Sequence, residues 1–205
     1  MSEVSFQEKR RPLPSRYLAH QKWSEKSVAH HRDQLTGLYN KDYFKRYVDA
    51  YDLKSNPPLT VVYVDLDSFK AINDTFGHQV GDHCLSSAAQ VLKKSFREED
   101  SSDIVARVGG DEFVVLALSP SNKKDLASFY KTINDRLKNN LLAYNQSLDN
   151  SNLPKITFSV GFASTDPTRD RTLCDTINRA DESMYQQKSE GKTKKELCQL
   201  SPLHA

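Results

Sequence analysis

One run of residues limits the possible folds more than any other part of the chain. Residues 59–67 read LTVVYVDLD, with β-branched and apolar side chains in succession until the acids begin. Such a continuous run is typical of a strand that is buried on both faces, at the centre of a sheet covered by helices. The chain has 205 residues, 37% of them hydrophobic, which is enough for one domain with a short extension. We therefore predict a single α/β domain.

The segments around this strand predict the order of the other elements. Asn40 is a good N-cap for the second helix. The order α-α-β-α-β-β-α-β-α indicates a mixed sheet with one hairpin and crossover helices. The pattern of apolar residues predicts helices over about 15–32, 40–51, 80–96, 123–143 and 173–187, and strands over 104–108, 113–118 and 155–164.

Acidic residues stand at the ends of two predicted strands. Asp65 and Asp67 are two positions apart, so in an extended chain their side chains point to the same side. The sequence Gly-Gly-Asp-Glu at 109–112 forms the tip of the predicted hairpin. If the hairpin pairs beside the central strand, the carboxylates converge, and such a cluster needs a cation. Oxygen ligands without a nearby His or Cys cluster favour Mg²⁺ or Mn²⁺ over zinc.

The same pattern has a simpler interpretation, since Gly and Asp are common turn residues and Gly-Gly-Asp-Glu alone is equally compatible with a turn. Acids at a second strand end favour a functional site. Because Mg²⁺ usually binds through a few carboxylates plus substrate phosphates, a nucleotide substrate is our hypothesis. The sequence contains neither G-x-x-x-x-G-K-[ST] nor G-x-G-x-x-G. Lys70, Lys188 and Lys192 are then candidate phosphate contacts, although each lysine taken alone is more typical of a solvated surface.

Charge and cysteine content exclude some partners. The 29 basic and 27 acidic residues leave a net charge of +2, which gives no support to bulk attraction for nucleic acid or membranes. The three cysteines are far apart without metal-binding spacing, as is typical of a reducing compartment. No apolar run approaches the roughly 18 residues of a membrane span, and residues 1–16 lack the apolar core of a secretory signal. We expect a cytoplasmic location, no nucleic-acid partner and no membrane segment.

Five sequence blocks occur in the order and spacing of one known family. They are DQLTGLYNKDYF at 33–44, DLDSFKAINDTFGHQVGDHCL at 65–85, GGDEF at 109–113, SVGFA at 159–163 and ADESMYQQKSEGK at 180–192. On these blocks the chain resembles the GGDEF domains of diguanylate cyclases, from about residue 33 to residue 192. The resemblance implies a central mixed, mainly antiparallel five-stranded sheet flanked by helices, similar to nucleotide cyclases and polymerase palms, here with an N-terminal helix.

The resemblance also implies an activity, the condensation of two GTP molecules to cyclic di-GMP with release of two pyrophosphates. Each domain would hold one GTP, so two domains would meet in a homodimer, where one 3′-hydroxyl attacks the other α-phosphate. By the same resemblance, Asp65 and Asp111 bind Mg²⁺ with help from the backbone carbonyl of Leu66. Either Asp111 or Glu112 accepts the proton of the 3′-hydroxyl, and the choice between them stays open.

The family pattern assigns the rest of the substrate site by matching positions. Asn73 and Asp82 would recognise guanine, because Asn both donates and accepts and Asp accepts from N1–H and the exocyclic amine. His78 lies beside them. Helix capping for Asn73 and Asp82, an ordinary polar surface for His78 and a core position for Phe69 are the structural alternatives. The full substrate-binding set is Phe69, Lys70, Asn73, His78, Asp82, Gly109, Gly110, Lys188 and Lys192.

Two departures from the family pattern bear on regulation and affinity. Many members carry an R-x-x-D product-inhibition site before the signature, and here Asp100 to Asp103 read Asp-Ser-Ser-Asp. A carboxylate cannot make the bidentate contacts of a guanidinium group, so we predict weak or absent feedback inhibition. Lys192 stands where the family usually has Arg, which predicts weaker phosphate binding.

We expect an N-terminal extension with a helix at 1–32, a catalytic domain at 33–195 and a tail at 196–205. An active diguanylate cyclase is the first hypothesis, because every signature acid is retained. A non-catalytic module that binds GTP or cyclic di-GMP and acts through a protein partner is the alternative. An enzyme that uses its nucleotide site for another transfer is the third.

Overall fold

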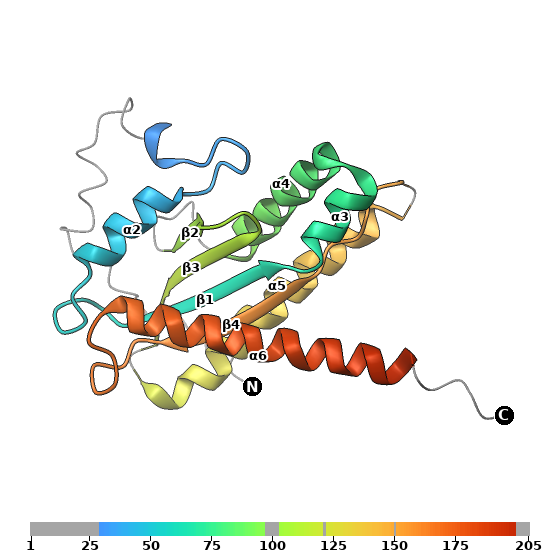
Figure 1. Cartoon of the computed structure of the whole chain (residues 1–205). Helices are drawn as coiled ribbons and strands as arrows, with labels where there is room; N and C mark the ends of the chain where they lie inside the picture. Colours follow the sequence, from blue (N-terminus) through green and yellow to red (C-terminus); the bar gives the residue numbers. More distant parts are fainter. Residues whose placement is uncertain (1–28, 97–102, 121, 150, 200–205) are drawn as a thin grey trace, which may run out of the picture.

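A four-stranded sheet between two layers of helices forms the centre of the computed structural model, which describes residues 29–96, 103–120, 122–149 and 151–199 (Figure 1). The spatial order is β2-β3-β1-β4, and neighbouring strands are antiparallel. The central position of β1 confirms the prediction from its apolar run. The strands are β1 (Leu59–Leu66), β2 (Ile104–Arg107), β3 (Glu112–Leu118) and β4 (Phe158–Ser164).

The helices agree with the predicted order except at three points. The eight-residue helix α3 was not predicted. Helix α6 was expected to end at 187 and continues to Gln199. The first helix was expected to end at residue 32, and in the structure η2 ends at His31, before a turn that follows Arg32. Positions 15–28 of the predicted N-terminal helix lie outside the described residues. The helices are η2 (Ala29–His31), α2 (Lys41–Ala50), α3 (Phe69–Phe76), α4 (His78–Ser95), η3 (Lys123–Asp125), α5 (Leu126–Ser147) and α6 (Leu173–Gln199).

Alternate residues of β1 pack into two separate cores. Val62 and Val64 face α4 and α5, whereas Val61 faces α2 and α6, and all three are fully buried. Each such side chain contributes about 1.5–3 kcal/mol of burial free energy. β1 is therefore apolar on both faces because helices cover both sides of the sheet.

In the part of the chain that the structure describes, no helix is long and apolar enough to cross a membrane.

The sheet has four strands in the described residues, where the family resemblance implied five. Tyr39 takes the place of a further edge strand, because its N–H donates to Val105 and its carbonyl accepts from Arg107, in a parallel bridge beside β2. The chain cannot extend this pairing, since it turns at Gly37 with φ +67° and enters α2 through the N-cap Asn40. This bridge supplies parallel pairing beside an otherwise antiparallel sheet.

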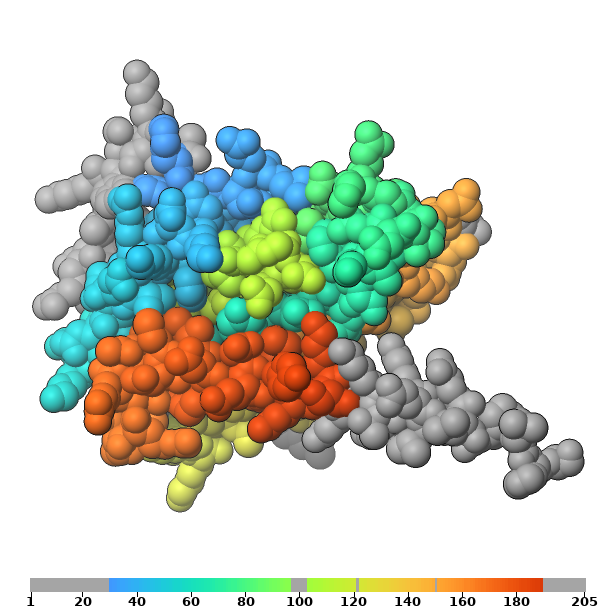
Figure 2. Space-filling view, viewed as in Figure 1, coloured from blue at the N-terminus to red at the C-terminus, as the bar shows by residue number. Residues whose placement is uncertain are grey.

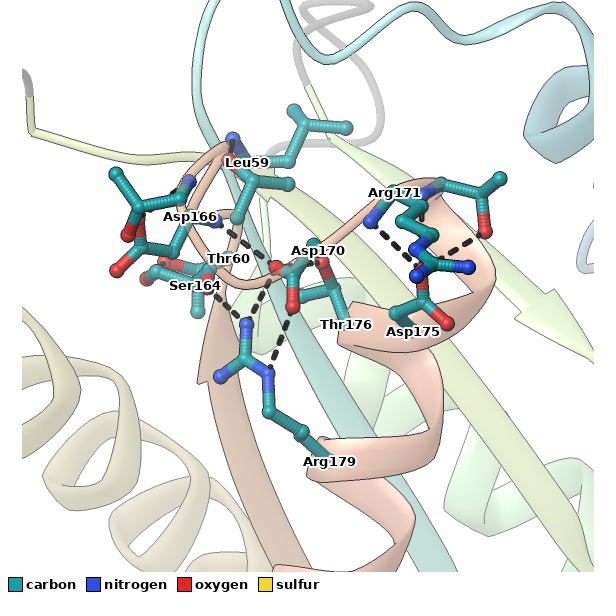
Figure 3. A network of polar contacts seen from close by, with 12 residues as sticks. Leu59, Thr60, Ser164, Asp166, Asp170, Arg171, Asp175, Thr176 and Arg179 are labelled. Atoms are coloured by element: carbon teal, nitrogen blue, oxygen red, sulfur yellow. Dashed lines mark hydrogen bonds and ion pairs between the residues drawn. The ribbon is translucent and has the colours of Figure 1, made fainter.

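A buried polar network fixes the start of α6 against the end of β4 (Figure 3). Asp170 accepts hydrogen bonds from Arg179 Nε at 3.0 Å and Nη2 at 2.6 Å, and from the Thr176 hydroxyl at 2.7 Å. Arg179 Nη2 also donates to the Ser164 carbonyl at 2.7 Å. Burial acts to raise the pKa of Asp170, but these hydrogen bonds outweigh it and hold the pKa below its usual value.

Contact between α6 and β4 is close all along the strand. A Cβ atom at Gly161 would collide with the backbone of Ala180 and Met184, so only glycine allows this approach. α6 therefore runs across the sheet in a fixed position and carries its second half toward the end of β1 (Figure 1). The domain boundary expected after residue 195 falls inside this helix.

Candidate functional site

The expected convergence of the two acidic strand ends is found at one edge of the sheet. Asp65, near the end of β1, pairs in register with Glu112 at the start of β3. The N–H of Leu66 donates to the carbonyl of Asp111 at 3.0 Å. Figure 2 shows this face, where the hairpin lies between α3 and α4 on one side and α6 on the other. The side chains of Asp65 and Asp111 are close enough to interact electrostatically.

An ion pair joins Asp65 to α6. Lys188 Nζ lies 2.6 Å from Asp65 Oδ1, with side chains 28% and 10% exposed. Burial raises the pKa of Asp65, and the charges of Asp111 and Asp67 add to this rise, whereas Lys188 opposes it. For Lys188, burial acts to lower the pKa, but the hydrogen bond and charge of Asp65 and the neighbouring carboxylates raise it on balance. The site thus contains three neighbouring carboxylates, of Asp65, Asp67 and Asp111, and the ammonium group of Lys188 partly neutralises their charge.

Asp67 has a structural role, so it differs from the other acids of the three or four that we expected to gather around a cation. Its carboxylate accepts hydrogen bonds from Thr157 Oγ1 at 2.8 Å and Ser159 Oγ at 2.6 Å. Its N–H donates to the Thr157 carbonyl at 2.9 Å. These three bonds tie the loop after β1 to the start of β4. Asp67 therefore holds the loop that leads into α3, which begins with Phe69 and Lys70.

Glu112 is folded back over the glycine turn. A Cβ atom at Gly109 would collide with its carboxylate, whereas a Cβ at Gly110 would point into open space. Tyr63 donates its hydroxyl hydrogen to Glu112 Oε1 at 3.3 Å. Burial, followed by the charges of Glu112 and Asp181, raises the pKa of Tyr63, so the phenol stays protonated and remains a donor. Of the two glycines, only Gly110 leaves room at its Cα for a ligand.

The hairpin tip is also held from β2. Arg107 donates to the Gly110 carbonyl from Nη2 at 2.7 Å and from Nε at 3.2 Å, and its Nη1 forms an ion pair with Asp33 at 3.2 Å. Our sequence reasoning singled out neither Arg107 nor Tyr63, and used Asp33 only as part of a motif. The available signal for Arg107 was an arginine two residues before the paired glycines.

The three residues predicted to recognise guanine lie on α3 and α4. Asn73 Oδ1 is buried without a hydrogen-bond partner and fills the space where Gly81 would carry a Cβ atom. His78 and Asp82 are exposed in the first turns of α4. The capping alternative does not hold for either residue, because Asn73 lies inside α3 and α4 begins at His78 after its N-cap Gly77.

A pocket of about 580 Å³ lies beside the acidic edge. Five residues of the predicted set line it, namely Leu66, Phe69, Lys70, Asp111 and Lys188. Asn134 and Lys138 on α5 line it too, and sequence reasoning missed them because α5 has the pattern of an ordinary amphipathic helix. Asn73, His78 and Asp82 are not among its lining residues, and the side chain of Lys192 lies outside the described part of the structure.

The oxygen donors at this edge fit a metal that is shared with a substrate. Among the residues that the structure describes, no group of three or more His, Cys, Asp or Glu side chains is arranged to hold a metal ion by itself. Asp65 and Asp111 are nevertheless close together beside the backbone of Leu66. Mg²⁺ typically takes one or two carboxylates, keeps several waters and completes its shell with substrate phosphates. This donor set therefore fits Mg²⁺ with a bound nucleotide better than an all-protein cage.

Comparison with known families identifies the chain. The family model described as "Diguanylate cyclase, GGDEF domain" matches residues 30–194. The chain belongs to the GGDEF domain family. The recognised blocks and the match thus cover almost the same part of the sequence, and the signature of this GGDEF domain is the hairpin tip described above.

Two curated relatives place this GGDEF domain among larger proteins. The biofilm architecture maintenance protein MbaA of Vibrio cholerae is 35% identical, with 88% of this chain and 23% of MbaA covered. The diguanylate cyclase DosC of Escherichia coli is 32% identical, with 82% of this chain and 35% of DosC covered. The chain therefore spans about a quarter to a third of the length of these relatives.

Solved structures share the fold of this GGDEF domain. The GGDEF domain of DgcB from Caulobacter crescentus, solved in complex with c-di-GMP, superposes with a TM-score of 0.65 at 28% identity and covers 78% of this chain and 91% of that one. The diguanylate cyclase SiaD from Pseudomonas aeruginosa, solved with its activator SiaC, has a TM-score of 0.66 at 26% identity, with 86% and 66% covered. The predicted α/β domain is confirmed.

Proposed function

We propose that this GGDEF domain is a diguanylate cyclase, which condenses two GTP molecules to cyclic di-GMP and releases two pyrophosphates with Mg²⁺ or Mn²⁺. One observation carries the proposal: Asp65, which forms an ion pair with Lys188, lies close to Asp111, and Asp111, Lys70 and Lys188 line the same pocket. Carboxylates beside ammonium groups suit a metal–triphosphate complex, in which the cation and the lysines share the phosphate charge.

Each residue has a definite task in this mechanism. Asp65, Asp111 and the Leu66 carbonyl would hold the metal ion, which when bound neutralises phosphate charge and activates the attacking oxygen. Lys70 and Lys188 orient the phosphates for in-line attack. The exposed Asp82 and the amide of Asn73 would select guanine.

The proton of the 3′-hydroxyl has two possible acceptors, Asp111 and Glu112. Glu112 accepts a hydrogen bond from Tyr63, and its carboxylate lies against Gly109. Asp111 has its backbone carbonyl tied to Leu66, which fixes its position next to Asp65. Glu112→Gln at saturating GTP distinguishes the two, because Asp111 is also a proposed metal ligand and its loss would lower kcat in either case. A large fall in kcat in Glu112→Gln assigns the proton to Glu112, and a retained kcat assigns it to Asp111.

A homodimer follows from the reaction, since one domain holds one GTP and the second must come from a partner copy. Synthesis should then rise more than linearly with protein concentration until the dimer is saturated. A non-catalytic module that binds GTP or cyclic di-GMP and acts through a protein partner is the competing function. The retained acids Asp65, Asp111 and Glu112 favour the enzyme.

The test is incubation of the protein with GTP and Mg²⁺ over a range of protein concentrations, with cyclic di-GMP measured by chromatography. We expect product from the unchanged protein and a loss of about a thousandfold or more in Asp111→Ala. Asp49→Asn, on the exposed face of α2, is the matched control and should keep full activity. GTP binding without turnover at any protein concentration would favour the binding module.

A further inference from the structure

The ion pair between Lys188 and Asp65 lies where a metal ligand is expected. Lys188 Nζ is 2.6 Å from Asp65 Oδ1, and the Asp65 side chain is only 10% exposed. A charge-assisted hydrogen bond of this length occupies one lone pair of the carboxylate. A divalent cation that approaches Asp65 also meets the positive charge of the ammonium group.

Lys188 can leave Asp65 without movement of the fold. α6 packs on β4 so closely that a Cβ atom at Gly161 would collide with Ala180, which keeps the helix backbone in place. The lysine reaches Asp65 through a flexible four-carbon stem and is bound as a point charge, so rotation about its side-chain bonds is enough to release it.

A second anionic partner for Lys188 would come with the substrate. Lys188 lines the 580 Å³ pocket together with Lys70 and Asp111. A triphosphate in this pocket offers several negative oxygens to the ammonium group, which has three donors. When Lys188 turns to the phosphate, both oxygens of Asp65 become available to a cation.

We propose that Lys188 is a built-in substitute for the divalent cation, which neutralises Asp65 in the nucleotide-free protein and is displaced when triphosphate and cation bind together. Because the triphosphate is the substrate of the proposed function, the inference rests on that function. Coupling between sites typically changes affinities by about 5- to 150-fold and is reciprocal, so nucleotide should strengthen cation binding within this range, and cation should strengthen nucleotide binding equally.

The experiment is a titration of the full chain with Mn²⁺ in the absence of nucleotide, followed by electron paramagnetic resonance of free Mn²⁺. Lys188→Met keeps the length of the side chain and removes its charge, and we expect it to bind Mn²⁺ about tenfold more tightly than the unchanged protein. Lys188→Arg keeps the charge and should bind as the unchanged protein does. Lys45→Met, which removes a lysine from the exposed face of α2 far from the site, should leave Mn²⁺ affinity unchanged.

A second titration includes a non-hydrolysable GTP analogue, which should strengthen Mn²⁺ binding more in the unchanged protein than in Lys188→Met. Circular dichroism verifies that each variant is folded. Mn²⁺ binding by Lys188→Met that is equal to or weaker than that of the unchanged protein overturns the inference, as does equal strengthening by the analogue. If Lys188→Met binds Mn²⁺ more tightly but the unchanged protein makes no cyclic di-GMP from GTP, the proposed cyclase activity is rejected and the inference about Lys188 stands.

Discussion

Two ion pairs between an aspartate and a basic residue of α6 have opposite character. Asp170 is paired with Arg179 through two hydrogen bonds, and both partners have further bonds, to Thr176 and to Ser164 (Figure 3). Asp65 is paired with Lys188 through one hydrogen bond at the edge of a pocket.

The difference follows from the two side chains. A guanidinium group presents a rigid fork that matches a carboxylate, whereas an ammonium group is a flexible point charge. A fully bonded pair can hold α6 in position, and a singly bonded pair next to a pocket can exchange partners. One helix therefore has a permanent attachment at Arg179 and an exchangeable contact at Lys188, about two and a half turns further on, at the site.

The largest expected effect is on stability at the permanent attachment. Asp170→Asn removes a carboxylate that is only 2% exposed and leaves the partly buried Arg179 without its charged partner, so we expect the free energy of unfolding to fall by about 3–5 kcal/mol. Asp65→Asn should cost about 1 kcal/mol or less, because Lys188 can turn its ammonium group to solvent. Urea unfolding measures both. Equal losses from the two variants would contradict the distinction between the pairs.

A pH series sharpens the same comparison with a smaller effect. Because the folded-state pKa of Asp170 is lowered, its contribution to stability is fully present above the unfolded value of about 3.9 and is lost as the pH falls through the folded value. The stability difference between the unchanged protein and Asp170→Asn should therefore be constant near neutral pH and shrink below about pH 4. Urea midpoints at several pH values test this. A difference that stays constant down to pH 2 would assign the loss to packing.

The sequence predicted the elements whose signals are local. The apolar run of β1 was sufficient to predict a central strand, and Asn40 was sufficient to predict the start of α2. Both signals are carried by residues that are adjacent in the sequence. α3 was missed because it has only eight residues, of which Ile72 alone is buried, so the segment is too short to show an apolar period. The polar second half of α6 has no apolar periodicity that would have predicted its continuation.

The candidate site shows the same division. The acids and lysines were predicted through motifs, but their pairing depends on register and helix packing. Lys188 and Asp65 are 123 positions apart, and Arg107 and Asp33 are 74 apart. Tyr63 and Glu112 meet only because β1 and β3 lie side by side in the sheet. Such contacts between distant residues have no local signal, so only the folded arrangement reveals which charged residues attach helices and which face a ligand.

The smallest expected effect is on product inhibition, at a position that carries an aspartate and lacks the guanidinium group of an arginine. Asp100 stands where related domains carry the Arg of R-x-x-D, and it lies outside the described residues. Unlike the guanidinium group of an arginine, the carboxylate of Asp100 cannot donate two hydrogen bonds to a guanine or phosphate of the product. Added cyclic di-GMP should then change the initial rate of synthesis by less than about twofold, since the two carboxylates Asp100 and Asp103 repel the phosphates of the product and offer no guanidinium donor. Progress curves with added product measure this. Asp100→Arg should introduce inhibition, and strong inhibition of the unchanged protein that disappears in Asp103→Ala would show that the site works without its fork.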